Sequence, residues 1–373
     1  MTRFYGLLSI CLFLLSVSCT QKEPAKPIRS GEIWPDNQGV HINAHGGGML
    51  YHEGTYYWYG ENKSDSTSKA MVGIMCYSSK NLTDWKNEGA VLPVELNDTT
   101  SDIIQGCIME RPKVIYNEKT KKFVMWFHLE LKGKGYAAAE YGVAVSDSPV
   151  GPFKFLHAGR SCSGIKPMNM SVDEVEELSS KLDIKRGEPG WRSAVDQGLF
   201  AARDLGRGQM VRDMTIFVDK DKKAYHIFAS EENQTLHIVE LSDDYCNYTG
   251  RYVRILPGKG NEAPTIFRHK GKYWLITSGC TGWAPNAARM AVADDIWGPW
   301  TELENPCIGE KANKTFNSQG TFILPVHGKK NVWIFMADRW NPNNLGDSRH
   351  IWLPISFDEN GVPELKWYDS WKY

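Results

Sequence analysis

The sequence lacks an excess of either charge, because 43 Lys and Arg residues stand against 44 Asp and Glu residues and the net charge is −1. Both signs are interspersed, which argues against a nucleic-acid partner or binding to a membrane surface through charge. No two of the 8 cysteines have CxxC spacing, which argues against a zinc site. We therefore expect no metal and no other cofactor.

Long apolar runs are also scarce, and the prominent one lies at the N-terminus. Arg3 precedes "FYGLLSICLFLLSV", a pattern typical of a secretory signal and too short for a retained membrane span. "LSVSC" resembles a bacterial lipobox that would lipidate Cys19, with Ser16 in place of the usual Leu; an ordinary cleaved signal is the alternative. We expect a lipoprotein signal over 1–19, a tether over 20–30, and an exported protein anchored to a bacterial membrane.

Six cysteines follow this segment, namely Cys76, Cys107, Cys162, Cys246, Cys280 and Cys307. Export permits disulfides, but their pairing cannot be deduced from the sequence. Aromatic residues are abundant, with 14 Trp and 16 Tyr. Because flat rings pack on the C–H faces of sugars, this composition favours a carbohydrate-binding cleft.

A hairpin pattern occurs five times: an apolar strand, a short polar turn and an aromatic-rich strand. The copies are "GGMLYHEGTYYWYGE" from 47, "KVIYNEKTKKFVMWFH" from 113, "TIFVDKDKKAYHIFASE" from 215, "TIFRHKGKYWLITSG" from 265 and "TFILPVHGKKNVWIFMAD" from 321. Phrases such as "SDSPVGPF" and "ADDIWGPW" between them are typical of further hairpins. We predict an all-β, five-bladed β-propeller over 31–373, with a β-sandwich as the alternative, and a monomer without a second domain.

One segment interrupts the strands. Residues 160–192 contain "SVDEVEELSSKL", in which Val172, Val175, Leu178 and Leu182 have helical spacing. Ser171 and Glu174 form a capping-box pattern. We predict a short helical insertion on one blade, either as surface decoration or as a wall of the cleft.

The inner strand of each propeller blade begins near the central axis, so equivalent positions converge there. Aligned by their turns, the hairpins place His45, Glu110, Asp213, Glu262 and Gln319 at this position. Converging carboxylates raise one another's pKa, which suits a group that must donate a proton near neutral pH, as in glycoside hydrolysis. The alternative is a structural role, with carboxylates paired to Arg111 and Arg212.

"RDMTIFVDKDKKAYHIF" and "NEAPTIFRHKGKYWLITSG" resemble the third and fourth blades of glycoside hydrolase family 43, which contains inverting enzymes on five-bladed propellers. The resemblance covers the chain after the tether. It implies that Glu262 is the general acid and that Asp213 orients it and raises its pKa. In most members an Asp of the first blade is the general base.

Here "AHGGGML" occupies the position of that Asp. The phrases "HINAHGGG", "ERPK" and "TSGCTGWAPN" resemble the branch that contains exo-β-1,3-galactanases, which lacks the usual base. In that branch a Gln and a Glu lie where the nucleophilic water sits, which implies Gln319 and Glu110. We expect Gln319 to position the water, Glu110 to supply negative charge, and the glycines to let the backbone approach the terminal sugar.

The same resemblance implies a set of substrate-binding residues. The expected residues are His45, Glu61, Tyr141, Asn233, Thr281, Trp283, Trp340 and Arg349. For Arg349 and its neighbour Arg339 a structural salt bridge is equally expected, and Glu61 and Asn233 could be solvated strand ends. Some relatives bind calcium through a last-blade His, but neither His327 nor His350 is expected in a ligand cluster, and "DKDKK" lacks the features of a calcium loop.

Three functions remain open. The first is an exo-acting glycoside hydrolase that releases galactose from β-1,3-galactan, with an oligo- or polysaccharide as its partner. The second is an α-L-arabinofuranosidase or β-galactofuranosidase of the same family, because small loop changes alter sugar specificity on one fold. The third is a non-catalytic glycan-binding lipoprotein.

Overall fold

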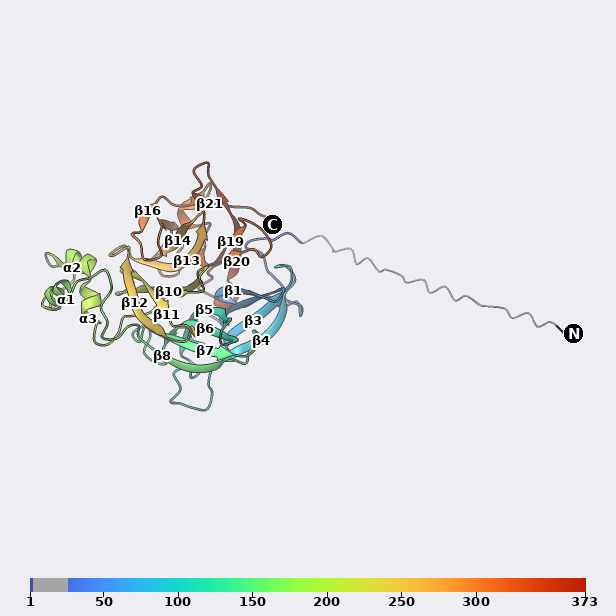
Figure 1. Ribbon diagram of the computed structural model, residues 1–373, viewed down its shortest axis with the longest axis horizontal. Coiled ribbons are helices and arrows are strands. Elements are labelled where there is room, and N and C mark those ends of the chain that lie inside the picture. The colour runs from blue at the N-terminus through green and yellow to red at the C-terminus, as the bar shows by residue number, and fades with distance from the viewer. Residues whose placement is uncertain (3–25) are drawn as a thin grey trace.

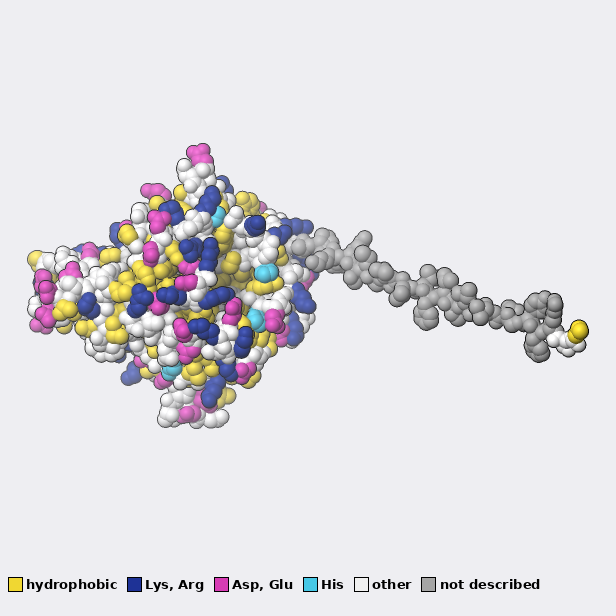
Figure 2. All heavy atoms as spheres, viewed as in Figure 1, with side chains coloured by type: hydrophobic (Ala, Val, Ile, Leu, Met, Phe, Trp, Pro, Cys, Tyr) yellow, Lys and Arg dark blue, Asp and Glu magenta, His cyan; other side chains and the backbone are white. Residues whose placement is uncertain are grey.

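Five antiparallel sheets surround a common centre (Figure 1), so the predicted five-bladed propeller is confirmed. The computed structural model describes residues 1–2 and 26–373. Each predicted hairpin forms the inner two strands of one blade. Lys and Arg side chains are interspersed with Asp and Glu on the visible face (Figure 2), in keeping with the balanced charge.

The strand bounds follow the repeat. Blade one contains β1 (His45–His52), β2 (Thr55–Glu61), β3 (Gly73–Ser79) and β4 (Lys86–Pro93); blade two contains β5 (Ile108–Asn117), β6 (Lys122–Glu130), β7 (Glu140–Ser146) and β8 (Lys154–Gly159). Blade three contains β9 (Met214–Val218), β10 (Ala224–Ser230), β11 (Thr235–Leu241) and β12 (Tyr248–Ile255); blade four contains β13 (Asn261–His269), β14 (Lys272–Gly279), β15 (Arg289–Ala293) and β16 (Thr301–Leu303). Blade five contains β18 (Gln319–Pro325), β19 (Trp333–Arg339), β20 (Arg349–Phe357) and β21 (Pro363–Lys366), and the short β17 (Cys307–Ile308) pairs parallel to β21.

The apolar core lies mainly between adjacent blades. Trp58 of blade one and Trp352 of blade five are fully buried in one such cluster, and Trp126 is fully buried between blades two and three. Part of the aromatic content therefore builds the core. All six cysteines after the signal segment are free thiols.

The two ends of the described domain meet on blade five. Ile28 exchanges backbone hydrogen bonds with Trp371 at 2.8 and 3.0 Å, and the Ser30 hydroxyl donates to the Trp352 carbonyl at 2.6 Å. The last residues of the predicted tether are therefore packed on the propeller. The signal sequence and residues 20–25 lie outside the described residues, apart from residues 1–2. Among the described helices, none has the length and apolar character to cross a membrane.

The helical insertion is larger than predicted. It contains α1 (Val172–Ser179), α2 (Trp191–Gln197) and α3 (Leu199–Arg203), which lie beside β12 in Figure 1. The capping box is present, with the Glu174 amide donating to the Ser171 hydroxyl at 3.1 Å. Val172 and Leu182 are exposed, contrary to the predicted apolar stripe, because only the face with Val175 and Leu178 packs on the other helices.

Four inner strands begin with a β-bulge beside the axial residue. The register shifts follow His45, Glu110 and Glu262 and interrupt β18 after Gly320. A bulge lets consecutive residues leave the normal alternation of a strand, so these side chains can turn toward the axis. Arg111 and Ala263, the residues after two of the axial carboxylates, accordingly have positive φ of 56° and 50°.

The first two glycines of "HGGGM" are explained by close packing. A Cβ on Gly46, whose φ is 61°, would lie 2.1 Å from Glu61 Oε1, and one on Gly47 would lie 1.8 Å from the Tyr59 carbonyl oxygen. These glycines allow β1 to lie against β2 and against Glu61, and their expected role in letting the backbone approach the sugar stays a prediction.

Gly47→Ala is expected to destabilise the fold by about 3 kcal/mol, because backbone of β1 and β2 must separate. Gly206→Ala is the control, since a Cβ there meets no atom within 4 Å. Denaturant midpoints of the two variants measure the difference. Equal midpoints would contradict the explanation.

Candidate active site

A pocket of about 440 Å³ lies at the axial ends of the inner strands. All five blades contribute to it. Its lining residues are Glu61, Lys63, Ser68, Glu110, Arg111, His128, Tyr136, Arg212, Asp213, Asn233, Glu262, Gly282, Trp283, Gln319 and Trp340. The four axial residues predicted to be catalytic are thus brought together. Four of the predicted substrate-binding residues also line the pocket, namely Glu61, Asn233, Trp283 and Trp340.

Glu262 and Asp213 form the first feature of this pocket. Burial, and then the charge of Asp213, raise the pKa of Glu262 to about 7. Asn233, which has a φ of 60°, donates from Nδ2 to Glu262 Oε1 at 2.8 Å. Asp213 accepts the backbone N–H of Ala263 at 3.1 Å, which fixes its position beside the bulge. Glu262 is therefore a carboxyl group that keeps its proton near neutral pH.

Glu110 has the opposite environment. Burial alone would raise its pKa, but Lys63 and His128 together hold that pKa below its usual range. Its Oε1 lies 3.3 Å from Lys63 Nζ and accepts the Tyr136 hydroxyl at 2.9 Å, and its Oε2 lies 3.3 Å from His128 Nδ1. His128 also contacts Glu130 at 3.0 Å, and despite burial its two carboxylate partners raise its pKa to about 9. Glu110 is consequently a permanent carboxylate.

Glu61, a predicted sugar ligand, is buried at the same end of the pocket. Its Oε2 lies 2.5 Å from Lys63 Nζ, and its Oε1 accepts the Arg111 backbone N–H at 3.2 Å. Burial, with a contribution from Glu110, raises the pKa of Glu61 to about 7 even though Lys63 opposes this. The two carboxylates thus share one lysine, and Glu110 is the more acidic of the pair.

Arg111 joins four blades at the centre of the site. Its guanidinium lies 2.9 Å from Asp213, donates to Gln319 Oε1 at 2.6 Å and donates to the Gly320 carbonyl at 2.9 Å. The side chain is only 6% exposed, so these contacts are shielded from solvent. The sequence alternative that paired Arg111 with an axial carboxylate is therefore correct for Asp213, whereas Arg212 approaches Glu232 at 3.6 Å instead.

Gln319 has a fixed amide orientation. Its Oε1 accepts two hydrogen bonds, one from Arg111 at 2.6 Å and one from the Trp340 indole at 3.0 Å, and its Nε2 donates to the Ser278 hydroxyl at 3.0 Å. Because Arg and Trp nitrogens can only donate, the amide oxygen must face them. The remaining polar atom of Gln319 is the second N–H, so this residue can donate to a substrate or water but has no free acceptor.

His45 lies behind the pocket. It is fully buried, approaches Asp338 at 3.3 Å and packs against Trp340 with ring centroids 5.8 Å apart. His350 approaches the same carboxylate at 3.0 Å and stacks on His45, so the expectation that it belongs to no ligand cluster is wrong. The expected pocket-floor role of His45 is replaced by support of Trp340.

Within residues 26–373, two clusters place metal-ligating side chains within 4.8 Å of one another, but neither fits calcium. The His45, Asp338 and His350 cluster offers one carboxylate and two imidazoles, whereas calcium prefers six to eight oxygen ligands. The second cluster offers the His128 imidazole and the carboxylates of Glu110 and Asp213, and these carboxylates are already paired with Lys63 and Arg111.

The remaining predicted ligands divide into two groups. Trp283 and Trp340 form a wall, with ring centroids 5.3 Å apart. Thr281 does not line the pocket; its hydroxyl donates to the Ala284 carbonyl at 2.5 Å and so shapes the loop that carries Trp283. Tyr141 packs on Trp126 and Tyr248 between blades two and three, and Arg349 pairs with Asp347 at 2.7 Å, so the structure does not bring Tyr141 or Arg349 to the pocket.

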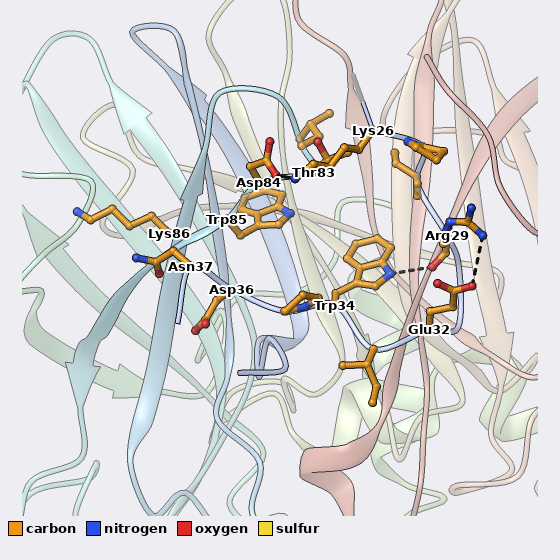
Figure 3. Close-up of a pocket in the computed structure, with 15 residues that line it drawn as sticks. Lys26, Arg29, Glu32, Trp34, Asp36, Asn37, Thr83, Asp84, Trp85 and Lys86 are labelled. Atoms are coloured by element: carbon orange, nitrogen blue, oxygen red, sulfur yellow. Dashed lines mark hydrogen bonds and ion pairs between the residues drawn. The ribbon is translucent and has the colours of Figure 1, made fainter. Parts of the chain in front are cut away.

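A second pocket, of about 550 Å³, lies between residues 26–37 and the β3–β4 turn (Figure 3). Trp34 and Trp85 line it, and two of its carboxylates lie close to cations of the same pocket. Asp84 pairs with Lys26 at 2.6 Å, and Glu32 lies 3.6 Å from Arg29. These carboxylates do not converge as those of the axial pocket do, so the axial pocket is the candidate active site.

Comparisons with known proteins agree with this assignment. A sequence profile of "Glycosyl hydrolases family 43" matches residues 196–363, whereas no curated protein matched. A solved family 43 β-1,3-galactosidase with galactodeoxynojirimycin is 54% identical, with a TM-score of 0.88 over 93% of this chain and 100% of that chain.

Two exo-β-1,3-galactanases are also similar. The enzyme from Phanerochaete chrysosporium, solved with β-1,3-galactotriose, is 32% identical with a TM-score of 0.73, over 93% of this chain and 68% of that chain. The enzyme from Clostridium thermocellum is 36% identical with a TM-score of 0.74, over 92% and 66%. The axial carboxylates, the propeller and these similarities together show that the chain belongs to glycoside hydrolase family 43.

Proposed function

We propose that the protein is an inverting exo-glycosidase that releases galactose from β-1,3-galactan. The observation that carries this proposal is the half-buried Glu262, whose pKa of about 7 suits a general acid, in a pocket built from all five blades. A pocket of this kind suits binding of the terminal sugar of a polysaccharide chain. The β-1,3-galactan specificity is supported by the activity named for the three similar enzymes.

In this mechanism Glu262 protonates the glycosidic oxygen of the departing chain. Asp213, held by Arg111 at 2.9 Å, raises the pKa of Glu262 and so favours its protonated form until the bond breaks. Trp283 and Trp340 pack on the faces of the sugar. The second N–H of Gln319 donates to a sugar hydroxyl or to the attacking water.

Activation of the water is assigned to the Glu110 carboxylate. The sequence hypothesis gave Gln319 the role of holding the water, but its oxygen already accepts from Arg111 and Trp340. Glu110 stays ionised beside Lys63 and His128, so it offers negative charge and an acceptor. The proposal therefore makes Glu110 the residue that orients and activates the water.

Exchanging the two side chains tests this assignment. Glu110→Gln is expected to lower kcat about 10²-fold or more, since the acceptor charge is lost. Gln319→Glu is expected to lower kcat less than tenfold, because a carboxylate still accepts from Arg111 and Trp340. Initial rates on a β-1,3-galactooligosaccharide measure both. A larger loss in Gln319→Glu than in Glu110→Gln would contradict the assignment.

The pH profile tests the acid. Activity requires protonated Glu262, so kcat/KM should fall as pH rises through about 7. Asp213→Asn removes a negative charge that raises this pKa, so its alkaline limb should move to lower pH. An unchanged limb in Asp213→Asn would mean that another group controls it. Asp219→Asn, in the β9–β10 turn, is the matched control.

The substrate is tested by identifying the product. Incubation with β-1,3-galactan is expected to release galactose, and proton NMR should show α-galactose as the first anomer because the configuration inverts. Incubation with arabinan should release nothing. Arabinose from arabinan, or no product from either polymer, would contradict the proposal.

We also propose that the protein is an exported, monomeric lipoprotein anchored through Cys19. The support is the apolar run after Arg3 and the "LSVSC" phrase. Metabolic labelling with a fatty acid is expected to label the wild type but not Cys19→Ala. Labelling of both would contradict the anchor. Sedimentation of the soluble domain tests the monomer.

A further inference from the structure

A basic recess adjoins the active-site pocket. We use this name for a cavity of about 690 Å³ lined by Lys134, Tyr136, Ala137, Arg160, Arg203, Asp204, Arg207, Met210, Arg212 and Glu232. Tyr136 and Arg212 line both cavities, so the two cavities adjoin at these side chains. Five cationic side chains face two carboxylates in the recess.

The two carboxylates are already used. Asp204 accepts both arms of Arg203 at 2.8 and 2.9 Å and lies 3.6 Å from Arg160. Glu232 contacts Arg203 at 3.0 Å and Arg212 at 3.6 Å. Within residues 26–373, Arg207 and Lys134 have no carboxylate partner at ion-pair distance. Glu140 is a third carboxylate near Arg160 and Arg207, so the five cations of the recess still outnumber the carboxylates around them.

Two of the arginines are held in place by the protein. The Arg160 side chain is only 4% exposed; two of its nitrogens donate to the carbonyls of Ala138 and Ala137, and its Nη1 lies 3.6 Å from Asp204. Arg212 Nη2 donates to the Tyr136 carbonyl at 3.0 Å. These contacts fix both guanidinium groups at the wall of the recess.

The insertion delivers part of this charge on an ordered scaffold. Arg203 ends α3, and the base of the insertion is tied by two backbone hydrogen bonds between Ser161 and Gln209, at 2.9 and 2.6 Å. The Gln209 amide donates to the Ala201 carbonyl at 2.9 Å, which fixes α3 to this base. The insertion thus forms one wall of the cleft edge.

We propose that the basic recess binds an anionic substituent, a uronate carboxylate or a sulfate ester, on a saccharide whose terminal sugar occupies the active-site pocket. The inference rests on the proposed function. The planar guanidinium groups match the geometry of carboxylate and sulfate oxygens, and the shared edge at Tyr136 and Arg212 lets one ligand reach both cavities. The protein would then prefer acidic branched galactans over neutral ones.

The test compares a uronate-bearing β-1,3-galactan with the same polymer after its carboxyl groups are reduced to alcohols. A sulfated galactan before and after desulfation forms the second arm. The Lys134→Gln/Arg207→Gln variant removes the two unpaired charges, and Lys329→Gln/Lys330→Gln removes the same charge at the distant β18–β19 turn.

The wild type and the control should prefer the acidic polymer, and Lys134→Gln/Arg207→Gln should lose about three- to tenfold in kcat/KM on it alone, mainly through KM. Added salt should remove the preference. A preference for the uronate-bearing polymer would identify a carboxylate as the bound anion, and a preference for the sulfated polymer would identify a sulfate ester. Equal wild-type rates on acidic and neutral polymers, or equal losses on both in the recess variant, would overturn the proposal.

Galactose release from the neutral polymer reports on the proposed function alone. If neither polymer is cleaved, titration calorimetry with acidic and neutral oligosaccharides makes the same comparison by affinity. Equal affinities would overturn the recess proposal independently of catalysis.

Discussion

Glu262→Gln is expected to lower kcat on β-1,3-galactan by about 10²- to 10⁴-fold, the range for loss of a general acid. The amide fills the same volume and can still meet Asn233, so the fold and KM should change little. Because an acidic phenol departs without protonation, the kcat of this variant on an aryl galactoside should fall far less. The ratio of the two losses isolates proton donation from binding.

Glu302→Gln supplies the control. Glu302 is an exposed residue of the edge strand β16, and its carboxylate pairs with Lys259. Its rates should equal those of the wild type. A Glu262→Gln enzyme that cleaves galactan at the wild-type rate would remove Glu262 from the mechanism. Equal losses on galactan and the aryl galactoside would assign it a role in binding or structure instead.

Arg111→Leu is expected to have the second large effect. It leaves Asp213 without its counter-ion and the Gly320 carbonyl without this donor, and it removes one of the two donors to Gln319 Oε1. Removing one partner of a buried ion pair typically costs about 3–5 kcal/mol, so the free energy of unfolding should fall by that amount. kcat should also fall at temperatures where the variant remains folded, because Asp213 and Gln319 lose their fixed positions.

Arg111→Lys separates charge from geometry. It should recover much of the stability but little of kcat, since an ammonium cannot bridge Asp213, Gln319 and Gly320 as a planar fork does. Urea unfolding and initial rates measure the two effects. Recovery of full activity in Arg111→Lys would show that charge alone suffices at this position. Arg268→Leu, which breaks an ion pair with Asp219 in the β9–β10 turn, is the matched control for stability.

The propeller and its axial residues could be predicted because both depend on local, repeated patterns. Alternation and turn residues define each hairpin, and the repeat itself aligns Glu110, Asp213, Glu262 and Gln319. The convergence of these four side chains then follows from the symmetry of the fold.

Arg111 could be suspected only as an alternative because regular alternation places it opposite Glu110. The bulge, with Arg111 at a φ of 56°, brings both to the pocket, and nothing in "MERPKV" specifies that bulge. Lys63, His128 and Tyr136 were missed for a related reason: they reach Glu110 from other segments. The paired arrangement of Lys63 with two carboxylates is a tertiary property.

Tyr141 shows the opposite error. The family resemblance implied a sugar contact for it, but the ring packs on Trp126 and Tyr248 between blades two and three. The hydroxyl that meets Glu110 belongs to Tyr136, in the preceding loop. A difference of five positions along the chain separates a core residue from a pocket residue, and sequence pattern alone does not resolve it.

The helical insertion enters and leaves the propeller at adjacent points, because Ser161 and Gln209 pair with each other. Its far side is held by Arg254, which bonds to Glu231 in blade three and to the Gln197 carbonyl at 3.0 Å. An inserted segment whose two ends lie side by side can change in length or sequence while the strands of every blade keep their register. The positions of the axial carboxylates therefore do not depend on the length of the insertion.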